Sequence, residues 1–320
     1  MSNIEIRKAT RKQAKLRIGL SGPSGSGKTY SALLLARGLA SAWNKILVID
    51  TENGSGELYS DLGDYNTITL IPPYTPERYI EAIAAAEKAG MEVIVVDSTS
   101  HEWEGKGGCL EMIDNIASAK FKGNTWAAWS EVTPRHQKFI QAIVGSTCHV
   151  ITTARSKTDM IQTEDKKIKK VGTKEIQREG FEYELTANFN IDREKHLTTT
   201  SKDRTGLFID RDPFIITTET GEEFKKWNEG GVVNVNELKR QVIFQLKDRL
   251  EIELPKEKQD LIEFVRTSIP KLTGIEYSEE NLTTILDGLK KIDDKEWANK
   301  TAWEAPKSAE EKEEDLANSI

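Results

Sequence analysis

The chain has 320 residues, of which 30% are charged and 37% hydrophobic, and its formal net charge is −7. This composition is typical of a globular protein with one large domain, or a domain and an appendage. The sequence has no apolar run near the roughly 18 residues of a membrane span, and its first residues lack the apolar stretch of a signal peptide. We therefore expect a cytoplasmic protein with no membrane partner. The acidic balance disfavours indiscriminate binding of nucleic acid but leaves room for a local basic site.

The cysteines and histidines show no metal-site signature in the sequence. Cys109 and Cys148 lack metal-ligand spacing, so we expect small buried residues in a reducing compartment. His101 stands beside Glu102 and Glu104 with no further ligand nearby in the sequence, so we interpret this stretch as a loop. The remaining histidines are scattered, without the spacing of a catalytic triad: His136, His149 and His196.

The first half of the chain alternates strand and helix patterns, which predicts a mostly parallel sheet covered by helices. The expected strands are Leu16–Ser21, Lys45–Asp50, Thr67–Ile71, Glu92–Asp97 and Cys148–Thr153. The expected helices are Lys28–Ala42, Glu77–Ala89 with Pro76 at its start, Leu110–Ala119 and Glu131–Val144. The fold class is therefore α/β.

The second half differs in character. A polar, basic segment at Ser156–Arg178 is followed by three short strands that we expect to add antiparallel to the sheet: Thr186–Asp192, His196–Thr200 and Phe214–Thr218. Gly230-Gly231 is a predicted hinge. Three amphipathic helices are expected after it, at Val235–Leu250, Lys256–Ser268 and Glu279–Lys291, before an acidic tail. We divide the chain into a core at 1–230, a small α-helical appendage at 231–303 and a disordered tail at 304–320.

A glycine-rich motif follows the first expected strand and opens the first expected helix. Its residues are Gly22, Pro23, Ser24, Gly25, Ser26, Gly27, Lys28 and Thr29, with Tyr30 next, and they match the spacing G-x-x-x-x-G-K-[ST]. The glycines let backbone N–H groups close around phosphate oxygens, and the helix N-terminus adds its dipole. Lys28 supplies charge for the β- and γ-phosphates, while the Thr29 hydroxyl can coordinate Mg²⁺. The motif predicts nucleoside triphosphate binding.

Two acidic residues complete the expected site. Asp97 ends the hydrophobic run Val93–Asp97, which fits a Walker B strand whose carboxylate holds Mg²⁺ directly or through water. The residues after Asp97 include no adjacent glutamate, whereas Glu52 follows the second expected strand. The ends of neighbouring parallel strands face the same crevice, so we predict Glu52 as the catalytic acid/base that orients water.

These motifs carry a family resemblance. The phosphate loop, the Ile-Asp-Thr-Glu segment ending at Glu52 and the Val-Val-Asp-Ser segment around Asp97 resemble the core of RecA-like recombinases. Three later stretches resemble phage-encoded RecA-like ATP-binding proteins of the AAA type, including the Sak-type single-strand annealing proteins: His149–Lys157, Gln177–Glu184 and Ser201–Gly206. The resemblance covers residues 14–220. It implies a RecA-like P-loop NTPase core, ATP and Mg²⁺ as cofactors, and water activation by the carboxylate matching Glu52.

The resemblance also implies residues that sense nucleotide. The strand after Walker B ends in such a sensor in RecA-like ATPases, and here Thr153 or Arg155 holds that place. RecA-like rings and filaments set cations of one subunit against the nucleotide of the next, and Lys202 and Arg204 resemble that position. The alternative for this pair is an exposed turn of mixed charge.

Two segments are candidates for DNA contact. Arg155–Arg178 holds eight Lys/Arg and four Asp/Glu and follows the sensor strand, where RecA-like proteins keep a mobile DNA-binding loop. We expect its lysines to track phosphates: Lys166, Lys167, Lys169 and Lys170. Lysines and aromatics are interleaved in Lys120–Trp129, where Trp126 can stack on single-stranded bases and Trp129 is alternatively a core residue.

We expect a DNA-dependent ATPase of phage recombination or replication, acting on single-stranded DNA as a homo-oligomeric ring or filament in the host cytoplasm. A phage or host single-strand-binding protein is a possible further partner. One alternative is a nucleotide-bound scaffold or loader that recruits replication partners and hydrolyses slowly. A GTPase switch is the other alternative, because Ser156–Asp159 resembles a guanine-reading motif, but Ser98 to Ser100 lack the glycine that a switch loop needs.

Overall fold

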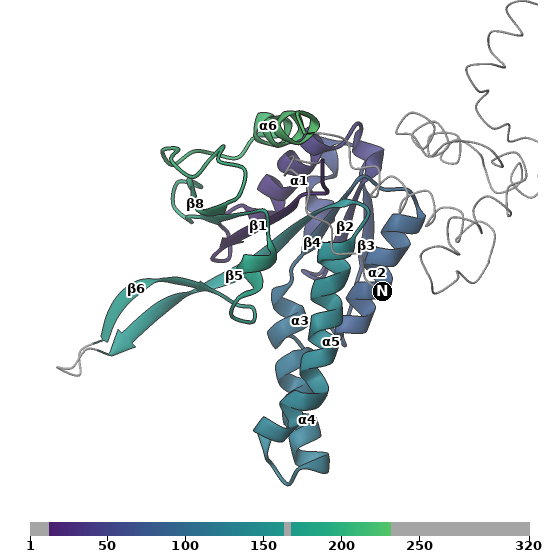
Figure 1. Cartoon of the computed structure of the whole chain (residues 1–320), viewed down its shortest axis with the longest axis vertical. Coiled ribbons are helices and arrows are strands. Elements are labelled where there is room, and N and C mark those ends of the chain that lie inside the picture. The colour runs from purple at the N-terminus through teal and green to yellow at the C-terminus, as the bar shows by residue number, and fades with distance from the viewer. Residues whose placement is uncertain (1–12, 163–167, 232–320) are drawn as a thin grey trace, which may run out of the picture. The chain divides into compact units, whose positions relative to one another are not determined.

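The computed structural model describes residues 13–162 and 168–231. The chain divides into two compact units, and one of them, Lys15–Gly230, contains every described helix and strand. Figure 1 shows this unit as a sheet with helices on both faces. The expected appendage helices after Val235 and the expected acidic tail Glu304–Ile320 lie outside the described residues.

The sheet has eight strands in the order β3-β2-β4-β5-β1-β7-β8, with β6 paired to β5. The pairs from β3 through β7 are all parallel, whereas β8 is antiparallel to β7 and β6 to β5. The strands are β1 Arg17–Gly22, β2 Ile46–Asp50, β3 Asn66–Thr69, β4 Val93–Asp97, β5 His149–Gln162, β6 Ile168–Glu175, β7 Ala187–Ile191 and β8 Thr198–Asp203. The expected α/β class with a mostly parallel sheet is confirmed.

Helices cover both faces of this sheet, so the central strands β2 and β4 are nearly continuous apolar runs rather than alternating ones. The helices are α1 Lys28–Leu39, α2 Pro76–Lys88, α3 Ser100–Glu104, α4 Cys109–Lys120, α5 Thr125–Gly145 and α6 Thr218–Glu229, and the 3₁₀ turns are η1 Trp43–Lys45, η2 Ser55–Leu62 and η3 Phe181–Glu184. Within the described residues, no helix combines the length and apolar character that crossing a membrane requires.

Strand β4 shows how the two layers share one sheet. Val93 and Val95 point into the core that α1 and α6 cover, and Ile94 and Val96 into the core that α2 and α5 cover. Successive side chains of a strand point to opposite faces, so the unbroken apolar run serves both layers at once. In Figure 1, α1 and α6 lie together on one side of the strands and α2 and α5 on the other.

Two glycines let α1 and α6 approach closely. A Cβ atom added at Gly38 of α1 would lie 2.1 Å from the carbonyl oxygen of Thr218 and 2.7 Å from the amide nitrogen of Glu222. A Cβ at Gly221 of α6 would lie 2.3 Å from the Leu35 carbonyl oxygen. Both obstacles are backbone atoms, which cannot rotate away as a side chain can.

We predict that Gly38→Ala lowers the free energy of unfolding by about 1–3 kcal/mol, because α6 must shift away from α1. Gly145→Ala is the matched control, since a Cβ at that position meets nothing within 4 Å. There the added methyl group should be neutral or stabilise the helix by up to about 1 kcal/mol. Urea unfolding of both variants checks the prediction, and equal stabilities would contradict it.

Apart from α3 and the start of α5, the expected strands and helices of the first half agree with the structure, whereas several expectations for the second half are wrong. The basic segment Ser156–Arg178 is not simply a loop: β5 continues to Gln162 and pairs antiparallel with β6. Strand β7 pairs parallel with β1, not antiparallel as expected. Strand β8 pairs antiparallel with β7, as expected. The expected strand Phe214–Thr218 contributes one bridge, between Phe214 and Thr198.

Three helices also differ from expectation. Residues 100–104 form the helix α3 rather than a loop. Helix α5 begins at Thr125, before the expected Glu131, because the Asn124 side chain caps it by accepting a hydrogen bond from the Ala127 amide at 3.3 Å. Helix α6 was not expected at all. A capping box between Thr217 and Thr220 starts it directly after the Phe214 bridge.

Candidate functional site

The candidate site lies at the edge of the sheet where β2, β4 and β1 end and where β5 continues beyond them. Strands β2, β4, β5 and β1 are consecutive in the sheet. Glu52 follows β2, Asp97 ends β4, the glycine-rich loop follows β1, and Arg155 of β5 pairs with Gly22 at the end of β1. Ligands of open α/β sheets bind at this edge. The fold therefore brings together the residues that the sequence motifs predicted separately.

The loop between β1 and α1 has the shape of a phosphate cradle. Gly25 and Gly27 have positive φ values of 80° and 87°, which a side chain would strain. Lys28 begins α1, and its Nζ donates a hydrogen bond to the Pro23 carbonyl oxygen at 2.9 Å. Burial lowers the pKa of Lys28, and the carboxylates of Asp97 and Glu52 oppose that shift. The ammonium group thus lies inside the loop that is expected to hold phosphates.

Asp97 joins three elements of the site. Its carboxylate, 2% exposed, accepts hydrogen bonds from the hydroxyl of Thr29 on α1, at 2.6 Å, and from the hydroxyl of Thr153 on β5. Burial raises the pKa of Asp97, whereas the two hydroxyl hydrogen bonds lower it. A carboxylate beside a hydroxyl is a set of hard oxygen donors of the kind that Mg²⁺ takes, so Thr29 and Asp97 fit the metal that the family implies.

Glu52 lies beside Asp97 at the end of β2, in contact with three other elements. Its carboxylate accepts a hydrogen bond from Ser98 Oγ at 3.0 Å and one from Arg155 Nε at 3.0 Å, and Arg155 Nη2 donates to the second oxygen. Burial raises its pKa, but Arg155, the nearby His101 and Ser98 together hold the pKa of Glu52 below its ordinary value. The side chain is 20% exposed, so an ionised carboxylate faces the solvent edge of the site.

The turn that carries Glu52 is fixed by hydrogen bonds within the strand ends. Asp50 accepts from the backbone amides of Glu52, at 2.6 Å, and Gly56, at 2.8 Å. The Thr51 hydroxyl accepts from the Ser98 amide at 2.9 Å, which ties the end of β2 to the end of β4. The peptide bond between Asp97 and Ser98 is cis. Glu52 is thus positioned by backbone contacts on both sides.

Two histidines and one serine contact the residues of the site, although the sequence motifs assigned them no role there. His101 stacks on Tyr74 with ring centroids 4.9 Å apart, and its Nε2 lies 4.0 Å from Glu52 Oε1. His196, in the turn between β7 and β8, places Nδ1 3.0 Å from the Ser26 carbonyl oxygen of the phosphate loop. Ser98 donates to Glu52, as described above. These contacts join residues far apart in the chain, so local spacing contains no signal for them.

The remaining expected site residues lie in other places. Lys202 Nζ and Arg204 Nη2 each donate to backbone carbonyl oxygens of η3, at 2.7 Å from Glu182 and Tyr183 respectively. Tyr30 is 42% exposed and packs against Tyr59 of η2 with ring centroids 5.6 Å apart. The two cations are therefore occupied within their own chain.

The DNA-contact candidates are only in part within the described residues. Lys169 and Lys170 are in β6, paired with Ile161 and Met160 of β5, while Lys166 and Lys167 lie outside the described residues. Trp126 is 87% exposed at the start of α5. Trp129 instead packs against Trp103, with centroids 5.8 Å apart, and beneath the Arg178 guanidinium. Trp129 is thus part of the packing between helices.

Comparison with known families agrees with this geometry. The model of the AAA domain family AAA_24 matches residues 14–224, which is more than half of the chain. The chain belongs to this AAA domain family. It is thus a P-loop protein of a nucleotide-binding ATPase family, and the match covers the phosphate loop, Glu52, Asp97 and the β5–β6 pair. A search of curated proteins finds no match.

We predict that Lys28→Met abolishes tight binding of ATP, because the ammonium group that lies inside the phosphate loop is then lost. Lys138→Met, on the exposed face of α5, is the control and should bind nucleotide as the wild type does. Fluorescence titration with a labelled ATP analogue measures both. Unchanged affinity in the Lys28 variant would show that the nucleotide binds elsewhere.

Proposed function

We propose that this protein is a RecA-like ATPase that acts on single-stranded DNA, and that its DNA contact and its hydrolytic site communicate through Arg155. The observation that carries the proposal is the double hydrogen bond from the Arg155 guanidinium to the Glu52 carboxylate. Arg155 lies at the point where β5 leaves the central sheet and begins to pair with β6. The residue that binds the expected catalytic base therefore belongs to the same strand as the basic hairpin.

The hairpin formed by β5 and β6 has the charge that a nucleic-acid contact requires. Arg155–Arg178 holds eight Lys/Arg and four Asp/Glu, in a chain whose net charge is −7. Figure 1 shows β5 and β6 projecting away from the sheet and its helices. Cations concentrated on a projecting element release counterions from phosphates when they bind a strand, which gives salt-dependent affinity.

Glu52 has the position and ionisation that water orientation demands. In the proposed reaction Lys28 binds the β- and γ-phosphates, and Thr29 and Asp97 hold Mg²⁺, which neutralises phosphate charge when bound. Glu52 accepts a hydrogen bond from the attacking water. Arg155 competes for the same carboxylate oxygens, so its contact with Glu52 restrains hydrolysis until the hairpin moves. DNA on the hairpin is the proposed cause of that movement.

A second subunit fits this proposal but is not required for it. Lys202 and Arg204 are the candidates for cations supplied to the nucleotide of a neighbouring subunit. Both hold carbonyl oxygens of η3 within their own chain, so that role requires these hydrogen bonds to open. Ring or filament assembly, annealing in phage recombination and a single-strand-binding partner belong to the same proposal.

We predict that single-stranded DNA raises ATP turnover of the full chain and that Glu52→Gln removes the stimulated rate. General-base catalysis contributes about 10²–10⁴-fold, so a loss of that size is expected, with nucleotide affinity retained. Glu57→Gln is the matched control, five residues away and exposed. Phosphate release with and without DNA is the measurement.

If single-stranded DNA does not raise ATP turnover of the wild type, the hypothesis of a DNA-dependent ATPase is contradicted. Absence of turnover in both conditions would instead favour the nucleotide-bound scaffold. Preference for GTP over ATP would favour the switch reading, although its candidate guanine motif Ser156–Asp159 lies in β5, paired with β6.

We further predict that replacing Lys166, Lys167, Lys169 and Lys170 with alanine weakens binding of single-stranded DNA and makes it less dependent on salt. Each lost phosphate contact reduces the slope of log affinity against log salt by about 0.7, so four contacts reduce it by about 3. A control removes the same number of charges elsewhere: Lys45, Lys138, Lys225 and Lys226. Fluorescence anisotropy over a salt series measures the DNA affinity of both variants. An equal slope of log affinity against log salt in the two variants would contradict DNA contact by the β5–β6 hairpin.

A further inference from the structure

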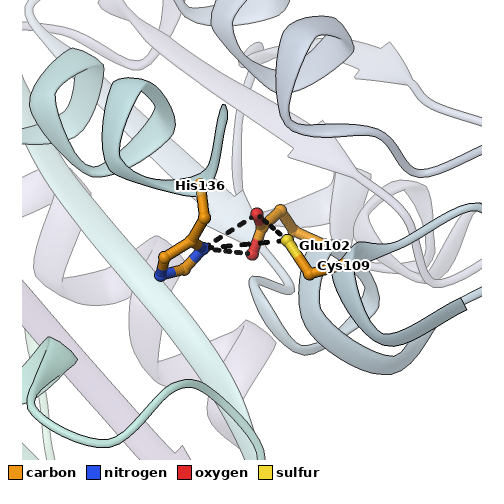
Figure 2. Close-up of side chains that lie close together, drawn as sticks. All are labelled: Glu102, Cys109 and His136. Atoms are coloured by element: carbon orange, nitrogen blue, oxygen red, sulfur yellow. Dashed lines mark hydrogen bonds and ion pairs between the residues drawn. The ribbon is translucent and has the colours of Figure 1, made fainter. Parts of the chain in front are cut away.

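Three side chains with metal-binding atoms meet in the interior between three helices. They are Glu102 of α3, Cys109 at the start of α4 and His136 of α5. Glu102 and Cys109 are 0% exposed and His136 is 3% exposed. Figure 2 shows the carboxylate, the thiol and the imidazole pointing toward one another.

The spacing of the three groups suits one small ion. Cys109 Sγ lies 3.0 Å from Glu102 Oε1 and 3.9 Å from His136 Nδ1, which in turn lies 3.0 Å from Glu102 Oε1. Zinc bonds of about 2.0–2.3 Å place the ligand atoms of a tetrahedral site about 3.3–3.7 Å apart. The three distances lie on both sides of that interval, so shifts of a few tenths of an ångström would admit the ion.

The number of donor atoms also suits zinc. Both oxygens of Glu102 face the imidazole, with Oε2 3.2 Å from His136 Nδ1. The thiolate, the imidazole and one carboxylate oxygen supply three ligand atoms, and the second carboxylate oxygen can bind as a longer fourth contact in a distorted site. Sulfur and nitrogen donors select zinc over Mg²⁺, which prefers oxygen alone.

Charge balance favours a divalent ion at this depth. A thiolate and a carboxylate carry two negative charges between them, and an isolated buried charge is costly. One divalent cation with a neutral imidazole makes the group electrically neutral. Without a cation, the Cys109 thiol donates a hydrogen bond to the Glu102 carboxylate at 3.0 Å.

The surroundings resemble the outer shell of a metal site. Gln177 Nε2 lies 3.4 Å from Glu102 Oε2 and donates to the Thr99 carbonyl oxygen at 3.1 Å, which orients the carboxylate. Trp103 packs edge-on against the His136 ring at 5.3 Å, and Phe139 lies 6.4 Å from it. The aromatic rings separate the cluster from water.

We propose that Glu102, Cys109 and His136 form a structural zinc site that joins α3, α4 and α5. The position of this zinc site has a consequence for the nucleotide site as well. Helix α3 carries Glu102 and the adjacent His101, and His101 lies 4.0 Å from Glu52. Zinc would therefore fix the helix that supports one side of the expected catalytic carboxylate. This inference is independent of whether the protein binds DNA.

The test uses the full chain purified without a histidine tag, since such a tag binds zinc itself. Elemental analysis and competition with a chromophoric chelator measure zinc content, and Co²⁺ replacement reports ligand type through its thiolate charge-transfer absorption. Cys109→Ser and His136→Gln are the test variants. Cys148→Ser is the matched control, because Cys148 is also buried but donates to the Met91 carbonyl oxygen rather than facing this cluster.

We expect about one zinc per chain in the wild type and in Cys148→Ser, with a thiolate–cobalt band in both. Both test variants should bind at least tenfold more weakly, and a chelator should lower Tm in the wild type but not in Cys109→Ser. The spectrum of the wild type alone decides the matter if a variant does not fold. Failure of the wild type to bind either ion tightly, or binding without the thiolate band, would overturn the proposal and leave the cluster as a hydrogen-bonded core.

Discussion

The carboxylate of Asp97 is the point on which the site depends. It accepts one hydrogen bond from Thr29, at the start of α1, and another from Thr153 of β5, the strand between the two motif-bearing strands. An ionisable group this deeply buried is tolerated when its oxygens have donors. The same two contacts hold the phosphate loop, the Walker B strand and the intervening strand in one fixed relation, before any ligand contributes.

Glu52 and Asp97 have different surroundings, which agrees with the different roles proposed for them. Asp97 contacts neutral hydroxyls, and burial raises its pKa, whereas Glu52 contacts a guanidinium and its pKa is lowered. Two carboxylates on adjacent strands thus have opposite environments. The buried one is suited to binding, and the more solvent-exposed, firmly ionised one to polarising a water molecule.

The sequence motifs predicted the phosphate loop, Asp97 and Glu52 because each depends on a short stretch and its flanking strand. The same reasoning missed contacts that tertiary structure alone creates. Arg155 and Glu52 are 103 positions apart, and His136 reaches Glu102 from another helix. The β5–β6 pair was interpreted as a loop because its residues are polar and charged, whereas strand pairing there needs only backbone hydrogen bonds. The composition of a segment therefore does not predict whether its backbone pairs with another strand.

Strand β5 is a single continuous element of 14 residues with two successive sets of neighbours. Its first half is clamped between β1 and β4, and its second half, paired only with β6 among the described residues, extends beyond them. From Arg155 to Gln162 this arm reaches about 23 Å at the usual rise of a strand. Because this arm is long, a small rotation of β5 at Arg155 corresponds to a large displacement of its far end at Gln162.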